Sequence, residues 1–410
     1  MEPDKKRTKE WDDLGISFGN GGDICQKCIG DPALGEFISS NATETVCSYC
    51  GQADANPFAS PLSRVVQQIA RIINEEFKHD ELKAYEAGNG DFYPYYRCFE
   101  DLLDRIGFWP EHFRVKTDVA SFFNKRTWWW KDTFSDRREC GWKRFCDVVR
   151  HSRRYTFWSS TEDIVPEGHP LYMPPSMILN EISAVVAELG LIRELPQDSL
   201  FWRVRLGKVS NRPEEFTSPP TEKAVQPNRM SPKGIPMFYG ADDFETAALE
   251  IAPLNPEGHY VSGAPFKCLR PMRILDLTVD FTRKVGQKSY FAPDGRAWRN
   301  DIAFLEKFSR DVSRPLTSDN EFLQQLMGQP QPDVDYVPTQ VFTEHVRYHV
   351  KWNGQPVDGI SYSSSKNRRN CCVLFFDQDD CLKAREGRPQ SLEYAGSSWR
   401  QVPLPLGTQA

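Results

Sequence analysis

Apolar residues recur with the period of a helix in two stretches of the first half of the chain. In "PLSRVVQQIARIINEEF", which begins at Pro61, the leucine, valine and isoleucine positions follow the 3.6-residue period, which predicts an amphipathic helix. "PPSMILNEISAVVAELGL" repeats the pattern, and Gly190 near its end suits a helix C-cap. We expect further helices between these two.

After Gly190 the pattern changes to short apolar runs separated by Pro-rich and polar loops. This change predicts a domain boundary near residue 195 and a strand-containing domain beyond it. In "LFWRVRLG", alternation places Phe201, Arg203 and Arg205 on one face of a strand. A half-buried pair of guanidinium groups binds either an anion such as a diphosphate or an acidic partner across the sheet, and the pattern leaves both open.

A buried strand followed by a helix is predicted next along the chain. "IPMFYGA" forms the strand, and Tyr239 lies at its end. "ADDFETAALEI" begins the helix, with Asp242 as the N-cap and Glu245 completing a capping box. Glu250 falls among apolar residues of that helix, so we expect its carboxylate in mostly apolar surroundings.

The last third of the chain predicts more strands and one helix. "RILDL" reads as a strand, and "TQVFTEHVRYHV" reads as a helix whose His345 and His349 are core or surface histidines, because no metal-ligating partners follow at a suitable spacing. "DGISYSSSKNRRNCCVLFF" gives a strand, a basic loop and a buried strand from 371 to 376. The first of these strands ends at three serines, Ser363, Ser364 and Ser365.

Three consecutive tryptophans lie between the two predicted helices, in "RTWWWKDTFSD". Trp128, Trp129 and Trp130 cannot all face one core from a single element. Core packing is the favoured interpretation, and an interface or a stacked ligand is the alternative for at least one ring.

Arg144 and His151 in "RFCDVVRH" have six residues between them. This spacing resembles the Arg-and-His signature of HEPN ribonucleases, in which the imidazole transfers protons and the guanidinium holds the scissile phosphate. Surface charge near the C-terminus of a helix explains the same residues equally simply and is the favoured interpretation.

Length and composition bound these interpretations. A chain of 410 residues suggests two to four domains, and 39% hydrophobic residues with 11 tryptophans exclude a disordered chain. The net charge of −6 argues against binding of nucleic acid by the whole protein. No apolar run is long enough to span a bilayer, and "MEPDKKRTKEWDD" lacks the apolar core of a secretory signal, so we expect a cytoplasmic protein. The odd number of 11 cysteines suits a reducing compartment.

Two C-x-x-C pairs near the N-terminus have the spacing of a tetrahedral zinc site. Cys25 and Cys28 form the first pair, and Cys47 and Cys50 follow after an 18-residue spacer. Four thiolates close the shell, so the zinc is expected to be structural. A redox dithiol or coincidence is the alternative. Because no dense Lys/Arg cluster flanks the pairs, protein contact or stapling of a small fold is favoured over binding of nucleic acid.

"FWRVR", "GIPMFYGADDFETAALEI" and "DGISYSSSKNRRNCCVLF", in this order over roughly residues 195 to 380, resemble the RES domain, which is named for its Arg, Glu and Ser. Longer members of that family similarly place a HEPN-like helical domain, sometimes with a zinc-binding segment, ahead of the RES domain. The resemblance implies a multidomain α+β protein with an ADP-ribosyltransferase-like C-terminal fold. The predicted domains are a zinc-binding segment over 1–58, a helical domain over 59–194, the RES domain over 195–385 and a tail over 386–410.

The resemblance also implies function. Family members are toxins that destroy cellular NAD and are commonly neutralised by an antitoxin. The family positions match Arg203, Tyr239, Glu250 and Ser364, with Ser363 as the serine that a one-residue shift would choose. Arg229 and Asn370 are weaker matches to family positions. Arg205 or Arg229 can help Arg203 to anchor the diphosphate of NAD. Long insertions over 207–228 and 280–335 depart from compact RES toxins and affect the rim of the pocket and the aligned serine.

These residue types suit cleavage of NAD without a catalytic metal. Nicotinamide leaves as a neutral base, so the chemical demand is stabilisation of an oxocarbenium-like ribose, which Glu250 can supply. Tyr239 can stack on nicotinamide, Arg203 can hold the diphosphate, and Ser364 can bind the nicotinamide or the ribose.

Three other functions stay open from the sequence. ADP-ribose could be transferred to a macromolecule instead of to water or phosphate. A HEPN-type RNase could use the C-terminal domain as a nucleotide sensor, and a non-enzymatic adaptor could dock partners through the zinc segment and tryptophans. The acceptor, the activating trigger, the antitoxin and the formation of a homo-oligomer are not decided by the sequence.

Overall fold

The computed structural model describes residues 9–17, 19, 21–81, 95–96, 99–123, 126–130, 134–159, 173–252, 259–278, 288–313, 331–387 and 389–404. The chain divides into two compact units. The first comprises residues 1–136 and 286–300, and the second comprises 137–285 and 301–410. Residues 137–194, which the sequence analysis assigned to the helical domain, pack within the second unit. The sequence-based boundaries themselves stay predictions.

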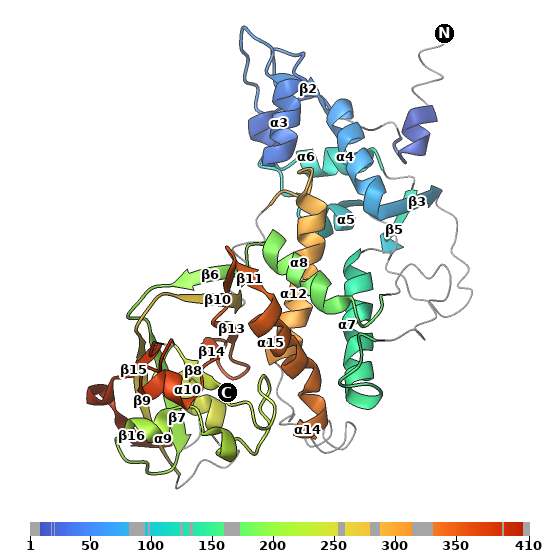
Figure 1. The fold of residues 1–410 in the computed structure, drawn as a ribbon. Helices are drawn as coiled ribbons and strands as arrows, with labels where there is room; N and C mark the ends of the chain where they lie inside the picture. Colours follow the sequence, from blue (N-terminus) through green and yellow to red (C-terminus); the bar gives the residue numbers. More distant parts are fainter. Residues whose placement is uncertain are drawn as a thin grey trace. The chain divides into compact units, whose positions relative to one another are not determined.

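The first unit combines short helices with a two-stranded sheet (Figure 1). Its strands β1 (Asp23–Cys25) and β2 (Ala59–Pro61) are antiparallel. The helices are α2 (Gln26–Ile29), α3 (Pro32–Ser40), α4 (Leu62–Glu76), α5 (Phe99–Ile106) and α6 (Val115–Ser121). α4 confirms the first predicted amphipathic helix, because most of its apolar positions are buried. Glu76 at its end is also buried, where it accepts hydrogen bonds from Tyr290 and Asn300.

A three-stranded sheet in the first unit replaces part of the predicted helical stretch. β3 (Phe77–Glu81), β5 (Arg126–Trp130) and β4 (Tyr95–Tyr96) are joined in that order. The tryptophans lie on strand β5, in keeping with the preference of threonine and aromatic residues for strands that pack on a core. The further helices expected between the two amphipathic helices are α5, α6 and α7 (Phe134–His151). Trp128 is fully buried, with its ring 5.2 Å from that of Phe99, so core packing is confirmed for this tryptophan. The side chains of Trp129 and Trp130 lie outside the described residues.

Further helices belong wholly or partly to the second unit. They are α7 (Phe134–His151), α8 (Ile178–Glu188), α12 (Gly295–Ser313), α14 (Pro332–Asp335) and α15 (Val337–His349). α8 confirms the second predicted amphipathic helix. Gly190 follows it with a φ of 62°, the left-handed conformation that favours glycine after a helix end. In the described part of the chain, no helix is long and apolar enough to cross a membrane.

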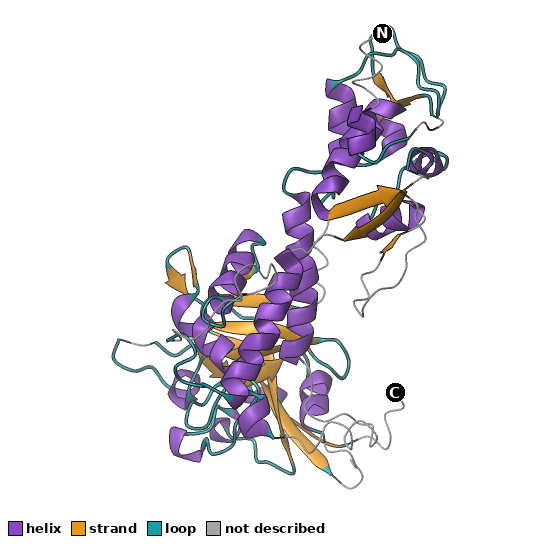
Figure 2. Ribbon diagram, turned by 90° about the vertical axis from the view of Figure 1, so that its right-hand side faces the viewer, coloured by secondary structure: helices purple, strands orange, loops and turns teal. Residues whose placement is uncertain are grey.

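A nine-stranded mixed sheet forms the centre of the second unit (Figure 2). Its order is β15-β9-β7-β8-β14-β13-β10-β6, and β16 pairs with β9 beside β15. β10 and β13 are parallel, whereas the other recorded pairs are antiparallel. The strands are β6 (Ile192–Leu195), β7 (Leu200–Leu206), β8 (Phe238–Ala241), β9 (Tyr260–Cys268), β10 (Met272–Leu277), β13 (Gly359–Ser363), β14 (Asn370–Leu374), β15 (Leu392–Tyr394) and β16 (Arg400–Pro403).

Short elements complete the second unit. They are α9 (Pro213–Phe216), η1 (Thr221–Lys223), α10 (Phe244–Ile251), the hairpin of β11 (Lys351–Trp352) and β12 (Gln355–Pro356), α16 (Gln378–Leu382) and η2 (Gly396–Ser398). The buried strand predicted over 371–376 is β14, which begins at Asn370 and ends at Leu374. A cluster of buried phenylalanines that includes Phe201, Phe238 and Phe266 forms the core on one side of the sheet.

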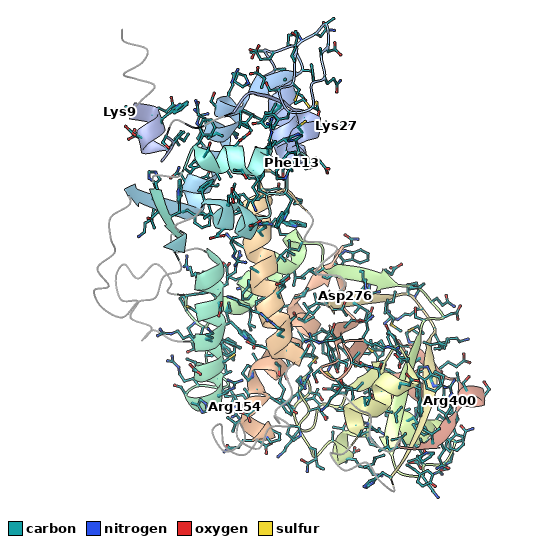
Figure 3. The ribbon with its side chains drawn as sticks, turned by 180° about the vertical axis from the view of Figure 1, so that it is seen from behind. Lys9, Lys27, Phe113, Arg154, Asp276 and Arg400 are labelled. Carbon is teal, nitrogen blue, oxygen red and sulfur yellow. The ribbon has the colours of Figure 1, made fainter. Side chains whose placement is uncertain are left out.

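Two strands late in the chain, over residues 392–394 and 400–403, belong to the sheet. Residues 386–410 were predicted to be a tail, yet β15 and β16 lie within this range and both pair with β9. Arg400 of β16 is labelled in Figure 3. Its guanidinium carbon lies 4.9 Å from the ring centroid of Trp202 of β7. Strand pairing over such a separation leaves little local signal in the sequence.

The two halves of the sheet are joined weakly between β7 and β8. β7 pairs with β9 along all of its residues, but its recorded pairing with β8 is limited to Trp202 and Ala241. The strands therefore separate beyond this pair, and the space between them is where the candidate site lies.

Candidate active site

Arg203 bridges the separation between β7 and β8. Its Nη1 donates to the backbone carbonyl of Tyr239 across 2.7 Å, so the side chain connects the two strands beside their single paired position. Arg203 is 6% exposed, and its Nε has no hydrogen-bond partner in the described structure. Burial, together with the nearby charge of Arg205, holds the pKa of Arg203 well below its usual value. A bound anion would relieve this cost.

Two further guanidinium groups reach the same space. Arg205 donates to the carbonyls of Glu215 and Thr217, and Arg229 donates to the carbonyl of Ser313. Within the described residues, neither these two arginines nor Arg203 forms an ion pair with a carboxylate. Burial lowers the pKa of Arg205, and the charge of Glu215 offsets part of this effect. Buried guanidinium groups without a directly paired carboxylate suit an anionic ligand.

Tyr239 uses its hydroxyl group to hold a neighbouring turn. The Met230 amide donates to the Tyr239 oxygen across 3.2 Å, and the Ser231 hydroxyl lies within hydrogen-bond distance of it at 3.0 Å. Burial raises the pKa of the phenol to about 12, so the hydroxyl stays neutral at physiological pH. The ring remains part of the cavity wall.

A hydrogen bond joins α10 to the turn after β13. Ser364 donates its hydroxyl to Glu250 Oε1 across 2.5 Å, and the same hydroxyl accepts from the Lys366 amide. Of the three candidate serines, Ser364 is therefore the one that forms a hydrogen bond with Glu250 in the described structure. Ser363 is buried beside it, whereas Ser365 is exposed.

Three expectations around α10 need correction. The N-cap is Asp243, whose side chain accepts from the Thr246 amide, and not Asp242. Asp242 instead accepts from the side chain of Asn370, so Asn370 is used within the fold and is not among the residues that line the cavity. Glu250 is exposed and not enclosed by apolar residues, because it lies on the last turn of α10 at the wall of the cavity.

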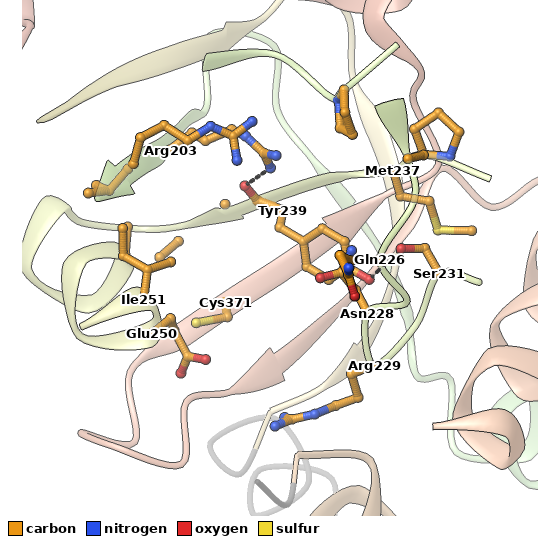
Figure 4. A pocket seen from close by; sticks show the side chains of 18 of the residues that line it. Arg203, Gln226, Asn228, Arg229, Ser231, Met237, Tyr239, Glu250, Ile251 and Cys371 are labelled. Carbon is orange, nitrogen blue, oxygen red and sulfur yellow. Dashed lines mark hydrogen bonds between the residues drawn. The ribbon is translucent and has the colours of Figure 1, made fainter. Parts of the chain in front are cut away.

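One cavity of about 560 Å³ collects most of these groups, a size typical of small-ligand sites. Figure 4 shows Arg203 and Tyr239 on one wall, with Glu250 and Arg229 on other walls. The predicted residues that line the cavity are Arg203, Arg205, Arg229, Tyr239 and Glu250. Ser364 and Ser363 line a smaller neighbouring cavity of about 390 Å³, and Ser364 reaches the first cavity through its bond to Glu250.

Two cavity residues near Glu250 were not predicted from the sequence. Tyr362 and Cys371 both line the cavity and pair with each other across β13 and β14. Burial raises the pKa values of both groups, and the negative charge of Glu250 contributes to each. Tyr362 precedes Ser364 by two positions, so the two-residue period of the strand is a signal that could have identified it.

Two parts of the chain match known protein families. Residues 200–395 match the family described as RES domain, and residues 40–163 match the family described as HEPN/RES N-terminal domain 1. The chain carries a RES domain. RES domains belong to a family of toxin-associated enzymes that process NAD. No curated protein and no solved structure gives a significant match to the chain.

Ahead of the RES domain, the four cysteines of the first unit form a site that could bind a metal such as zinc. Their four Sγ atoms lie within 4.8 Å of one another. The Cys25–Cys50 and Cys28–Cys47 Sγ distances are both 3.8 Å. A tetrahedron with Zn–S bonds of about 2.3 Å has edges of about 3.8 Å, so the donor set fits zinc. Although burial raises it, backbone hydrogen bonds lower the pKa of Cys47 to about 7, which favours a thiolate ligand.

The predicted non-ligand histidines lie on α15, outside the RES cavity. The His345 Nε2 is 2.7 Å from the Ser183 hydroxyl, and the His345 ring stacks on His349. Neither histidine belongs to the cysteine group, which is the only cluster with metal-ligand geometry in the described residues.

Proposed function

We propose that the RES cavity binds NAD and that the protein cleaves the bond between nicotinamide and ribose. The observation that carries this proposal is that Glu250 and three arginines without a carboxylate partner in the described structure line one cavity. The three arginines suit the diphosphate of a ligand, and the carboxylate suits a part of the same ligand where positive charge develops during the reaction.

The arginines are the residues that would bind the diphosphate of NAD. Arg203 is buried with an unpartnered Nε, and Arg229 also has an unpartnered buried Nε in the described structure. Each guanidinium is anchored to a backbone carbonyl through Nη1 and keeps a positive charge with no carboxylate partner in the described structure, a charge that would attract phosphate oxygens. Anchored donors lose little further freedom when the ligand binds. Arg205, held at two carbonyls, adds positive potential beside Arg203.

Glu250 accounts for the reaction. As nicotinamide leaves, its bonding electrons neutralise the pyridinium ring and the ribose becomes an oxocarbenium-like cation. A fixed carboxylate stabilises this cation more than it stabilises the ground state. Ser364 occupies Oε1, so Oε2 remains for a ribose hydroxyl or the anomeric carbon. The serine is thus a positioning residue for the glutamate.

Release of nicotinamide tests the reaction. The full chain is incubated with NAD, and nicotinamide is followed by NMR or chromatography. Glu250→Gln keeps the shape of the side chain and should lower kcat by at least about a hundredfold. Glu245→Gln is the matched control, because Glu245 is exposed on the same helix and does not line the cavity. An inactive wild-type protein that binds NAD would instead favour a nucleotide-binding adaptor.

The acceptor of ADP-ribose defines the finer activity. Attack by water gives glycohydrolysis, attack by phosphate gives phosphorolysis, and attack by a macromolecule gives ADP-ribosyl transfer. NAD labelled in its adenylate part separates these products, because only transfer leaves label on protein or nucleic acid. The sheet, with its separation between β7 and β8, supports an ADP-ribosyltransferase-like fold.

The proposed biological setting follows from the RES family. The chain would act as a cytoplasmic toxin or defence protein that depletes NAD and is held inactive by an antitoxin or a regulatory partner. Structural zinc at Cys25, Cys28, Cys47 and Cys50 would hold the N-terminal unit together. Self-association is a further proposal that sedimentation of the purified chain tests.

An RNase is the second candidate. Arg144 and His151 are both exposed on α7, and a spacing of seven positions places them on the same helix face. The HEPN/RES N-terminal match covers both residues. His151→Ala should abolish RNA cleavage while leaving nicotinamide release unchanged if this candidate holds.

A further inference from the structure

The turn that carries Arg229 is held on several sides by polar contacts. Asn228 and Ser231 pair with each other through two backbone hydrogen bonds of 2.8 Å and 3.2 Å, so Arg229 and Met230 form the tip of a tight turn. Met230 is fully buried, whereas Arg229 lines the RES cavity.

Helix α15 binds the carbonyl groups of this turn. Gln340 Nε2 donates to the Asn228 carbonyl across 2.8 Å and to the Ser231 carbonyl across 3.4 Å. The Thr339 hydroxyl donates to the Arg229 carbonyl. Gln340 and Thr339 are both buried, at 8% and 7% exposed. The Tyr239 hydroxyl accepts from the Met230 amide.

The turn thus has three carbonyls and one amide held by side chains from two other elements. A buried amide side chain that donates twice to one short turn restricts the turn to one conformation. This conformation of the turn sets the direction of the Arg229 side chain. The Nη1 of Arg229 also donates a hydrogen bond to the Ser313 carbonyl across 2.6 Å. None of these contacts requires a ligand.

We propose that Gln340 and Thr339, together with the Tyr239 hydroxyl, form a clamp that positions Arg229 for the phosphate groups of the dinucleotide. Gln340 and Thr339 are positioning residues, because neither lines the cavity. This inference rests on the proposed function for its ligand, but the clamp itself is a property of the fold.

Gln340→Met tests the clamp because it preserves the length of the side chain and removes both donors. Gln390→Met is the matched control, since Gln390 Nε2 also donates to two carbonyls, those of Cys381 and Leu392, and does not line the cavity. With NAD as substrate, Gln340→Met should raise KM by about tenfold with kcat within about twofold, as expected when a charged contact is misplaced before the reaction. Gln390→Met should leave both constants near their wild-type values.

Two more measurements separate positioning from general loss of structure. In an Arg229→Met background, Gln340→Met should cause no further rise in KM, because the clamp acts through Arg229. Thr339→Val, which removes one donor at nearly constant volume, should shift KM in the same direction by a smaller factor. Equal effects of the Gln340 and Gln390 variants, or additive effects of Gln340→Met and Arg229→Met, would overturn the proposal.

Amide hydrogen exchange tests the clamp independently of NAD. Residues 228–231 should be protected in the wild-type protein and exchange at least about tenfold faster in Gln340→Met, because the turn opens locally. Unchanged exchange would overturn the clamp even if NAD is cleaved. Inactivity of the wild-type protein towards NAD, with faster exchange in the variant, would overturn the proposed function and leave the clamp standing.

Discussion

Ser364 donates its hydroxyl to Glu250 Oε1 across 2.5 Å and thereby joins the turn after β13 to the last turn of α10. Two other contacts tie the same parts together, since Asn367 donates to the Thr246 hydroxyl and Arg369 forms an ion pair with Asp243. The orientation of Glu250 is therefore fixed before a ligand arrives, which is what electrostatic stabilisation of a transition state requires.

Ser364→Ala should lower kcat for NAD by about ten- to a hundredfold, because the freed carboxylate can adopt other rotamers. Ser365→Ala should keep activity near the wild-type value, since this serine is exposed and is not in recorded contact with Glu250. Steady-state release of nicotinamide measures both. Equal losses in the two variants would contradict a specific role for Ser364.

Arg203→Met should abolish binding of NAD and leave the free protein at least as stable as the wild type. The variant loses the hydrogen bond to Tyr239 but removes a buried guanidinium that has no carboxylate partner. Replacing a buried charge by a side chain of similar size is neutral or stabilising by roughly 1 kcal/mol. Thermal unfolding with and without NAD measures both effects. A destabilised variant would show that Arg203 serves the sheet more than the ligand.

Tyr239→Phe separates the ring of Tyr239 from its hydroxyl. The variant keeps a ring in the cavity but loses the acceptor for the Met230 amide. We expect KM for NAD to rise several-fold, roughly 0.5–1.5 kcal/mol in binding, with kcat little changed. Tyr239→Ala should lower kcat as well, because the stacking surface is removed. A large loss of kcat in Tyr239→Phe would place the hydroxyl in the reaction itself.

His345 should make the second unit sensitive to acid. Burial and the neighbouring His349 lower its pKa from 6.5 to about 4. The unfolded chain therefore binds the proton more tightly, so this contribution to stability is present above pH 6.5 and is lost as the pH falls towards 4. The loss is about 3 kcal/mol at most.

His345→Gln checks this contribution, because glutamine can still contact the Ser183 hydroxyl but does not titrate. Denaturant unfolding from pH 7 to pH 4.5 should show a smaller decline for the variant than for the wild type. Parallel declines would assign the acid sensitivity to other groups.

Removal of the proposed zinc should unfold the N-terminal unit. The purified chain should contain about one zinc, and Cys28→Ser should lose it together with roughly 3 kcal/mol or more of stability in this unit. Cys140→Ser is the control, because Cys140 is exposed and lies outside the cluster. Metal analysis and hydrogen exchange over residues 21–77 measure the two effects. Full stability after complete chelation would contradict a structural metal.

Much of the second unit could be predicted where the determining signal is local. The alternation of β7, the period of α8 and the order of strand and helix around Tyr239 each depend on neighbouring residues. The cap of α10 was misplaced by one residue because Asp242 and Asp243 offer the same chemistry. The contact with Asn370 that occupies Asp242 comes from a distant strand.

What could not be predicted depends on contacts between distant segments. The exposure of Glu250 follows from its place on the wall of a cavity that distant segments form together, and the separation of β7 from β8 follows from the pairing of whole strands. The two donors of Gln340 reach a turn more than a hundred residues earlier. No property of the segment around Gln340 in the sequence marks it as a partner of Arg229.

Strands β15 and β16 determine how short an expressed fragment of the RES domain can be. A fragment that stops at residue 385 would remove β15 and β16, both of which pair with β9. The nine residues of β9 would then present a long row of open backbone donors and acceptors, a template for intermolecular aggregation. A recombinant RES domain therefore has to extend through Leu404, whose amide donates to the His259 carbonyl and closes this border.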